Sequence, residues 1–401
     1  MKKRQLINEI MGVPKAIDEW VNLYEKVVMS IIEDMVNSDD WEFHRFEHDG
    51  ETKEAYGKQL TWSGKEAMEL ILKEAGMDLK TFINTDTFEG FPLYNPGLRV
   101  TLELFPDELF VGMDNQLEAT HSFEGNHSNI KISKLGKKSI YPNNKFEFDF
   151  KIPVSYRDEF SKTKERELSN DVVPVIAHEL THSYQSYMEF LGGKEKVGFG
   201  REQILNSAFG NVKLEETPSW NNFVYLMYLH LSFEVNARVT QLYYEMKRKG
   251  VNDKKSAMEH LRKSNIWDTY SMLSSFDTEK FMREFKLDLP DDVEEDVTDF
   301  FMGLIMGGGP NDKPKSREKD EWYEYLIKKW DTTLQMAQQK FESLGLNAPI
   351  MDRVPEKAKK NPKLFFKFFE NRFKKKAENF RRKMVRVVTL IVQESQEENN
   401  K

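Results

Sequence analysis

Apolar and polar positions repeat with two different periods along the chain, and the change of period separates a mixed first half from a helical second half. Residues 15–37 carry apolar side chains at helical spacing, which predicts an amphipathic helix. The strand-like alternation over 40–62, around an Asp-Gly turn, predicts a β-hairpin. A short helix is expected over 65–75. Segment 97–153 is expected to form a sheet, because its short runs are β-branched or aromatic; these runs are LRVTLELF, ELFVGM, NIKIS and FEFDFKIPV.

Helical patterns dominate after the sheet. One helix is expected to begin near Asn170 or Asp171 and to end at Gly192, with Pro174 in its first turn. A long helix is expected from about 219 to 249. The closing residues QESQEENNK are expected to form a disordered polar tail. Further helical patterns cover 254–275, 290–306, 316–344 and 362–393, with a glycine-rich break at 306–316.

These patterns predict an α+β chain with three consecutive regions. Residues 1–95 are expected to hold the N-terminal helix and the β-hairpin. Residues 96–250 are expected to form the core, with a sheet followed by helices. Residues 251–401 are expected to form a helical C-terminal region with a basic amphipathic helix and the polar tail.

Composition excludes several classes of chemistry. The chain has 401 residues and no cysteine, so disulfides, thiolate metal sites and cysteine nucleophiles are excluded. Its formal net charge of −8 gives no general attraction to nucleic acid. The absence of cysteine favours a cytoplasmic location. The basic start MKKRQLINEI lacks an apolar core for a signal peptide, and no apolar run is long enough to predict a transmembrane segment.

The stretch VIAHELTHSY, residues 175–184, carries the main candidate chemistry. His178 and His182 are four residues apart, so on a helix both imidazoles can face one ion. Glu179 follows His178 and can act as a base toward a water on that ion. The competing interpretation is a pair of core histidines beside a surface glutamate. The uncharged flanks favour the metal site, because three polar groups on a buried helix need partners.

VIAHELTHSY resembles the extended signature of the zincin metallopeptidases, an HExxH flanked by uncharged residues. The resemblance implies a zincin-like fold with a mostly antiparallel sheet, the HExxH helix and a largely helical C-terminal half. It also implies one Zn²⁺ per chain. The metzincin branch needs Gly and His where this chain has Gln185 and Met188. The resemblance is therefore to gluzincins, which take a glutamate from a downstream helix as the third ligand.

Glu234 is the best candidate for that third ligand. It lies in the run EVNAR, and its E-x-x-A-R pattern is similar to third-ligand helices of HExxH families. The alternative is a surface pair with Arg238. His230, Glu234 and Arg238 are spaced by four, so His230 could donate to an oxyanion or replace Glu234 as ligand, or be a core histidine. Arg238 could orient Glu234 or hold a substrate carboxylate.

The expected function is zinc-dependent hydrolysis of peptide bonds in a peptide or protein substrate. Zinc would lower the pKa of its water toward about 7, and Glu179 would accept the proton and pass it to the leaving amine. An edge strand, NIKIS or FEFDF, is expected to pair with the extended substrate, or both are buried sheet. The oxyanion donor is left open among five residues: Tyr225, Tyr228, His230, Arg238 and Tyr243.

Two other classes of function stay open. One is a noncatalytic zincin-like structural or binding protein, against which the intact Glu179 argues. The other is a regulator associated with nucleic acid or a membrane surface through the basic segment 361–388. There, an apolar stripe of phenylalanines lies opposite a face of Lys and Arg. The plainer interpretation of this segment is a helix whose stripe packs in the core and whose basic face is solvated.

Overall fold

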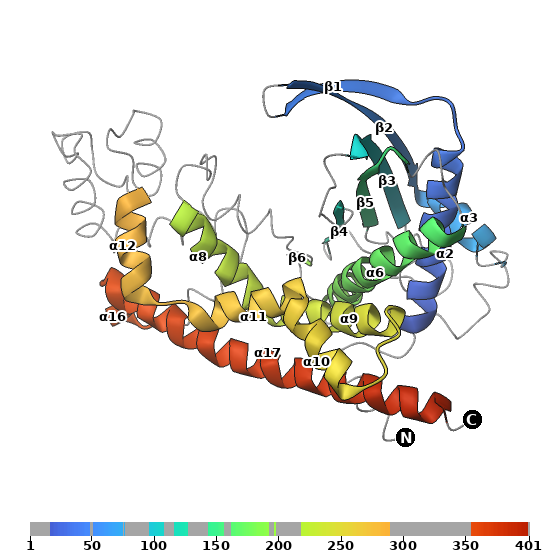
Figure 1. Ribbon diagram of the computed structural model, residues 1–401. Helices are drawn as coiled ribbons and strands as arrows, with labels where there is room; N and C mark the ends of the chain where they lie inside the picture. Colours follow the sequence, from blue (N-terminus) through green and yellow to red (C-terminus); the bar gives the residue numbers. More distant parts are fainter. Residues whose placement is uncertain are drawn as a thin grey trace. The chain divides into compact units, whose positions relative to one another are not determined.

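The computed structural model shows a mixed α+β chain, as the apolar pattern predicts (Figure 1). It describes residues 17–48, 51–74, 76, 96–107, 116–126, 143–155, 162–191, 196–197, 218–288 and 354–399. The predicted strands ELFVGM and NIKIS, the predicted helices 290–306 and 316–344, and the glycine-rich break at 306–316 lie outside these residues. No helix in the described part of the chain is both long and apolar enough to span a membrane.

The chain divides into two compact units that are not continuous in sequence. The first unit contains Met1–Gly198, Asn236–Lys263 and Lys383–Lys401. The second contains Phe199–Val235 and Ser264–Arg382. This division differs from the predicted consecutive regions 1–95, 96–250 and 251–401, because single long helices cross from one unit into the other.

The first unit is built on a six-stranded sheet with the order β1-β2-β3-β5-β4-β6. Its strands are β1 (Glu42–His48), β2 (Glu51–Ser63), β3 (Pro96–Phe105), β4 (Gln116–Asn126), β5 (Asn143–Pro153) and β6 (Lys196–Val197). All neighbouring pairs are antiparallel except β3 and β5, which are parallel. The predicted hairpin and the mostly antiparallel sheet are confirmed. Strand β4 was not among the predicted runs, although Leu117, Ala119 and Phe123 alternate with polar residues along it.

One face of this sheet is apolar and packs against helices. Alternate residues of β3 and β5 are fully or almost fully buried; they are Leu98, Val100, Leu102, Leu104, Phe146, Phe148, Phe150 and Ile152. Helix α2 (Ile17–Val36) packs against β3, and Tyr24 lies 4.9 Å from Phe146 between ring centroids. The predicted helices over 15–37 and 65–75 are confirmed as α2 and α3 (Gly64–Glu74).

Helix α6 (Lys162–Leu191) carries the HExxH motif and packs against α2 and β4. It starts at Lys162, so the prediction of a start at Asn170 or Asp171 is wrong, and Pro174 lies inside the helix. The segment before Pro174 is rich in Lys, Glu, Arg and Leu, which favour helix. Contact with α2 adds to this preference: the Ser169 hydroxyl donates to Glu25 at 2.6 Å. The predicted end before Gly192 is confirmed.

The predicted helix over 219–249 is two helices, α8 (Pro218–Leu229) and α9 (Ser232–Arg248). The break falls at His230 and Leu231, where the Leu231 N–H bonds to the Tyr228 carbonyl in a tighter turn. The predicted pattern 254–275 is similarly divided into α10 (Lys254–Lys263) and α11 (Asn265–Ser275). Ser264 causes this second break by accepting a hydrogen bond from the Trp267 N–H at 3.3 Å, as an N-cap residue does.

Phenylalanine rings form the core of the second unit. Phe223 of α8 lies among the rings of Phe276, Phe281, Phe365, Phe366, Phe369 and Phe373. Phe281 belongs to α12 (Thr278–Asp288), and the last four belong to α17 (Pro362–Asn399), which follows the short helix α16 (Glu356–Lys359). The helix predicted over 362–393 is confirmed and reaches Asn399, so the disordered-tail prediction is wrong up to that residue.

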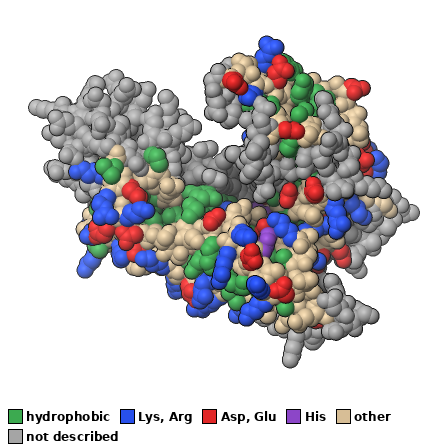
Figure 2. Space-filling model, viewed as in Figure 1, with side chains coloured by type: hydrophobic (Ala, Val, Ile, Leu, Met, Phe, Trp, Pro, Cys, Tyr) green, Lys and Arg blue, Asp and Glu red, His purple; other side chains and the backbone are tan. Residues whose placement is uncertain are grey.

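The phenylalanine stripe of α17 is buried, which supports the plainer interpretation of this basic segment. Phe366, Phe369, Phe373 and Phe380 have no exposed surface. Lys and Arg occupy the outer face of α17, and several of them pair with Glu370 or Glu378 on the same helix. Basic and acidic side chains are correspondingly interspersed on the surface in Figure 2. The stripe is therefore not available for insertion into a membrane surface.

Candidate metal centre

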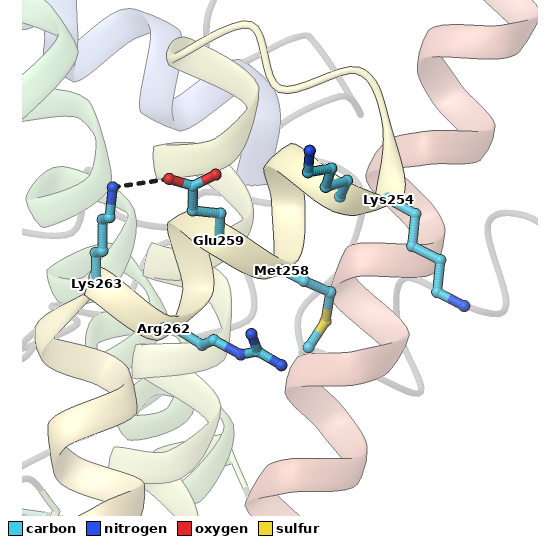
Figure 3. Close-up of a pocket in the computed structure, with 6 residues that line it drawn as sticks. Lys254, Met258, Glu259, Arg262 and Lys263 are labelled. Carbon is cyan, nitrogen blue, oxygen red and sulfur yellow. Dashed lines mark hydrogen bonds and ion pairs between the residues drawn. The ribbon is translucent and has the colours of Figure 1, made fainter.

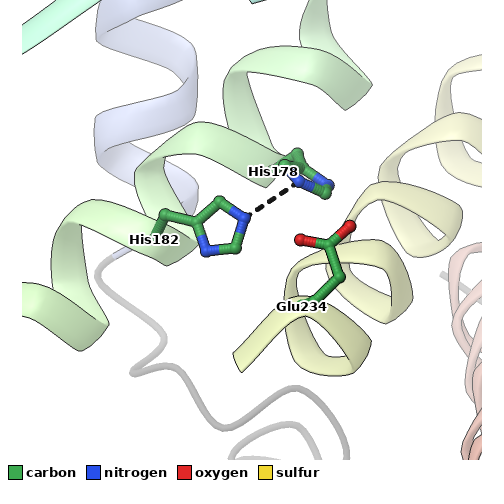
Figure 4. Close-up of side chains that lie close together, drawn as sticks. All are labelled: His178, His182 and Glu234. Carbon is green, nitrogen blue, oxygen red and sulfur yellow. Dashed lines mark hydrogen bonds between the residues drawn. The ribbon is translucent and has the colours of Figure 1, made fainter. Parts of the chain in front are cut away.

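The HExxH motif places two imidazoles on one face of α6. His178 and His182 lie one helical turn apart, and their ring centroids are 4.7 Å apart. Their Nε2 atoms approach to 3.0 Å (Figure 4). The neighbouring residues Ile176, Ala177 and Leu180 are fully buried, so the rest of the helix is held in the core. Burial on the flanking positions thus fixes the direction in which both imidazoles point.

Glu234 approaches the same point from the first turn of α9. Its side chain has no exposed surface, and Figure 4 shows its carboxylate directed toward the two histidines. The ligand atoms of His178, His182 and Glu234 all lie within 4.8 Å of one another. The three predicted ligands are therefore brought together.

Each histidine has a glutamine carbonyl beside its Nδ1 atom. His178 Nδ1 lies 3.1 Å from Oε1 of Gln241, and His182 Nδ1 lies 3.3 Å from Oε1 of Gln185. An amide oxygen can only accept, so with both amides in this orientation the contacts favour the tautomer that carries the proton on Nδ1. Both Nε2 atoms then carry unshared electron pairs, 3.0 Å apart. A divalent cation, or one shared proton, stabilises such an arrangement.

The donor set fits a catalytic zinc ion. Two imidazole nitrogens and one carboxylate are a set used for zinc where a fourth position is left for water or substrate. Two nitrogen ligands on tetrahedral zinc, with Zn–N distances of about 2.0–2.1 Å, lie roughly 3.3 Å apart. The separation of 3.0 Å between the two Nε2 atoms is close to this value. Calcium and magnesium prefer all-oxygen sites, so the imidazoles argue against them.

The third ligand also has a hydrogen-bonded partner. The Tyr228 hydroxyl donates to Oε2 of Glu234 at 2.5 Å, which leaves Oε1 to face an ion. Tyr228 lies in the last turn of α8, where its ring packs edge-on against Phe233 at 6.1 Å. Tyr228, one of the residues considered as an oxyanion donor, therefore lies beside the proposed ligand Glu234. Its hydroxyl proton is directed to the Glu234 carboxylate.

Sequence reasoning missed the two glutamines. Gln241 follows Glu234 by seven residues and Gln185 follows His182 by three, so both spacings return to the same helix face. That spacing could have indicated that both glutamines lie near the site. Their residue type could not, because a glutamine is common on any half-exposed helix.

Two further candidate residues lie on the same two helices as the ligands. Glu179 is only 7% exposed and directly follows His178 on α6. Arg238 lies half-buried on α9, one turn after Glu234.

His230 does not belong to this group of ligands, and its predicted roles as oxyanion donor or substitute ligand are corrected. The prediction assumed one continuous helix, whereas His230 lies in the break between α8 and α9. Its Nδ1–H donates to the Met227 carbonyl at 2.5 Å, and its ring packs against Phe369 and Phe373. Burial, together with the charges of Arg372 and Lys376, lowers the pKa of His230 to about 4. His230 is thus a neutral core histidine.

Two other expectations about the site are also corrected. The Tyr243 hydroxyl donates to Glu394 of α17 at 2.8 Å, so it serves packing of the helices instead of the metal group. FEFDF lies in β5, which pairs with β3 on one side and β4 on the other, so it is a central strand and cannot take an extra strand. Its alternating buried phenylalanines explain why the sequence pattern predicted a strand there.

A shallow hollow on α10 shares no residue with the group of His178, His182 and Glu234. It is lined by Lys254, Lys255, Met258, Glu259, Arg262 and Lys263 (Figure 3). Lys263 pairs with Glu259 at 2.9 Å. All lining residues come from one helix, and none belongs to the group of His178, His182 and Glu234, so this hollow is a basic helix surface.

Comparison of the chain with protein-family models, curated proteins and solved structures finds no match.

Proposed function

We propose that this chain is a zincin-like, zinc-dependent peptidase that holds one Zn²⁺ through His178, His182 and Glu234. The observation that supports this most directly is the meeting of the three side chains from α6 and α9, with ligand atoms within 4.8 Å of one another. The order of the fold, a mostly antiparallel sheet followed by the motif helix and further helices, supports the same proposal. Bound zinc would polarise a substrate carbonyl and lower the pKa of a coordinated water.

Glu179 supplies the proton transfer in this proposal. It is the residue next to His178, on the helix that carries both histidines, and it is not among the three ligands. As general base it accepts the proton of the attacking water, and as general acid it returns that proton to the leaving amine. A base at this position has no use in a purely structural metal site, so Glu179 favours hydrolysis over the noncatalytic alternative.

Arg238 is proposed to orient Glu234 or to hold a substrate carboxylate. Its position one turn after Glu234 on α9 puts both side chains on one side of that helix. The guanidinium is a fixed cation with a planar fork of donors, which suits either role.

The position of strand β4 in the sheet favours a peptide in extended conformation as the substrate. It packs against α6, the motif helix. One edge of β4 pairs with β5, whereas on the other edge the described residues pair it only at Gly125 and Asn126. Since no other described residue pairs with Gln116–Glu124 on that edge, we propose that an extended peptide adds there as a strand. This edge replaces NIKIS and FEFDF as the proposed peptide-binding strand.

The proposal is tested by comparing Glu179→Gln with the matched control Glu167→Gln, an exposed position on the same helix. Zinc content and cleavage of a fluorogenic peptide library are measured for each protein. We expect wild type and Glu167→Gln to cleave with chelator sensitivity and recovery on adding zinc. Glu179→Gln should retain zinc and lose about 10²-fold or more in rate. Equal rates for Glu179→Gln and wild type, or no cleavage by zinc-loaded wild type, would overturn the proposal.

A further inference from the structure

Gln241 contacts a ligand of the proposed site and is not itself a ligand. It lies on α9 seven residues after Glu234, and both face α6 because that spacing is close to two full helical turns. Its Oε1 atom lies 3.1 Å from Nδ1 of His178. Helix α9 therefore contributes one ligand and also a group that orients a ligand of the other helix.

We propose that Gln241 is a positioning residue that commits His178 to metal binding through Nε2. This inference rests on the zinc site proposed above. A neutral imidazole carries one proton, and the two nitrogens compete for it. The amide oxygen of Gln241 can only accept, so it stabilises the tautomer with the proton on Nδ1. That tautomer leaves the Nε2 electron pair directed toward His182 and Glu234.

The chemistry of the partner decides what Gln241 does to the ion. A carboxylate in its place would add a negative charge and make the imidazole more basic. A glutamine fixes the tautomer without adding charge. Glu234 is then the one charged ligand, and a bound dication keeps a net positive charge near the substrate. The neutral partner therefore favours polarisation of a substrate carbonyl by the ion, whereas a carboxylate partner would favour higher metal affinity.

Gln185 offers the same contact to His182 from within α6, at 3.3 Å. The longer distance, and its position on a half-exposed turn of the same helix, predict a weaker effect. Removing the carbonyl of Gln185 should therefore cost less zinc affinity than removing that of Gln241.

Zinc affinity of the full chain is the first readout, measured by competition with a chromophoric chelator. Gln241→Leu removes the acceptor at similar size, and Gln241→Glu keeps an acceptor and adds charge. Glu245→Gln is the control on the same helix, because Glu245 pairs with His260. We expect Gln241→Leu to weaken zinc binding by about 10–100-fold. Gln241→Glu should bind at least as tightly as wild type, and Glu245→Gln should bind as wild type does.

The second readout is the tautomer of His178 in metal-free protein, from ring nitrogen chemical shifts. Wild type should show the Nδ1–H form, and Gln241→Leu should lose that preference. Unchanged zinc affinity and an unchanged tautomer in a folded Gln241→Leu variant would overturn the inference. If the wild-type protein does not bind zinc, the proposed function is contradicted instead. The tautomer measurement separates the two failures because it needs no metal.

Discussion

The Nε2 atoms of His178 and His182 face each other at 3.0 Å, while the Nδ1 atom of each ring contacts a glutamine carbonyl. This geometry favours the proposed metal site over a pair of core histidines. A core histidine such as His230 uses its ring to satisfy a local carbonyl and to pack against aromatic rings. The pair on α6 instead brings two Nε2 atoms together, where a bound cation or one shared proton would be stabilised.

Tyr228→Phe is predicted to weaken zinc binding. The substitution removes the hydroxyl that donates to Glu234 at 2.5 Å and leaves the ring in place. Loss of a hydrogen bond to a metal ligand typically costs about 10-fold or more in metal affinity. Competition titration with a chelator measures the effect. Tyr225→Phe is the control. The Tyr225 ring stacks on that of Tyr228, but the hydroxyl that donates to Glu234 belongs to Tyr228. Equal affinities for Tyr228→Phe and wild type would contradict the role of Tyr228.

His230 is predicted to make the free energy of unfolding depend on pH. Its folded pKa of about 4 lies below the ordinary value of 6.5, because burial disfavours the charged ring. The unfolded chain therefore takes up the proton first as the pH falls. The stabilising contribution is complete above pH 6.5 and is lost as the pH falls from 6.5 toward 4. The loss by pH 4.5 amounts to about 2–3 kcal/mol.

His230→Asn isolates this contribution, since the amide nitrogen of asparagine can still donate to the Met227 carbonyl but does not titrate here. Urea unfolding of both proteins is measured at pH 7.5 and 4.5 with a chelator present. The other histidines titrate alike in the two proteins, so the difference between them reports on His230. The variant should lose less stability on acidification. Parallel pH dependences would show that His230 is not buried as described.

Among the described residues of the second unit, Glu370 is predicted to be the carboxylate that contributes most to stability. It is 2% exposed and accepts hydrogen bonds from both the N–H and the hydroxyl of Thr278, at the start of α12. Lys367 and Lys374 also donate to it. Burial opposes its ionisation, but these donors outweigh burial and lower its pKa to about 2. Its contribution is thus present above about pH 4.5 and is lost as the pH falls toward 2.

Glu370→Gln should lower the free energy of unfolding by about 2 kcal/mol at neutral pH, because charge-assisted hydrogen bonds become neutral ones. Glu378→Gln is the control on the same helix. Glu378 is 44% exposed and pairs with two exposed arginines, so its loss should cost clearly less than the loss of Glu370. Urea titration compares the two. Equal losses would mean that burial does not distinguish these carboxylates.

Phe373→Ala is predicted to destabilise the second unit strongly. The ring is fully buried and contacts Phe223, Phe276 and Phe369. Removing a buried phenylalanine typically costs about 3–5 kcal/mol. Leu364→Ala, at a position 48% exposed on the same helix, should cost under about 1 kcal/mol. Thermal unfolding distinguishes them. A mild effect of Phe373→Ala would indicate that the stripe is exposed and available to another surface.

Local pattern was sufficient where one segment decides its own structure. The apolar period predicted α2, and the Asp-Gly turn predicted the hairpin. The i,i+4 histidines predicted the face of α6. Glu234 was identified through the resemblance to gluzincins and its E-x-x-A-R run, and its carboxylate lies beside the two imidazoles. In each case, one short segment carried the whole signal.

The remainder depended on contacts between segments far apart in sequence. No glycine or proline marks the break at His230, which coincides with packing against Phe369 and Phe373 more than a hundred residues later. The polar end of α17 stays helical, and there Glu394 accepts a hydrogen bond from Tyr243. Gln241 gains its role only when α9 lies beside α6. Such contacts leave no periodic pattern in the sequence.

Metal analysis of the purified chain tests the central claim most directly. Elemental analysis by mass spectrometry, with anomalous X-ray scattering at the zinc edge, gives the ion, its stoichiometry and its ligands. The account predicts one zinc ion per chain on His178, His182 and Glu234, and its loss in His178→Ala. Zinc-supplemented protein that binds no ion, or that binds it through other residues, would contradict the account.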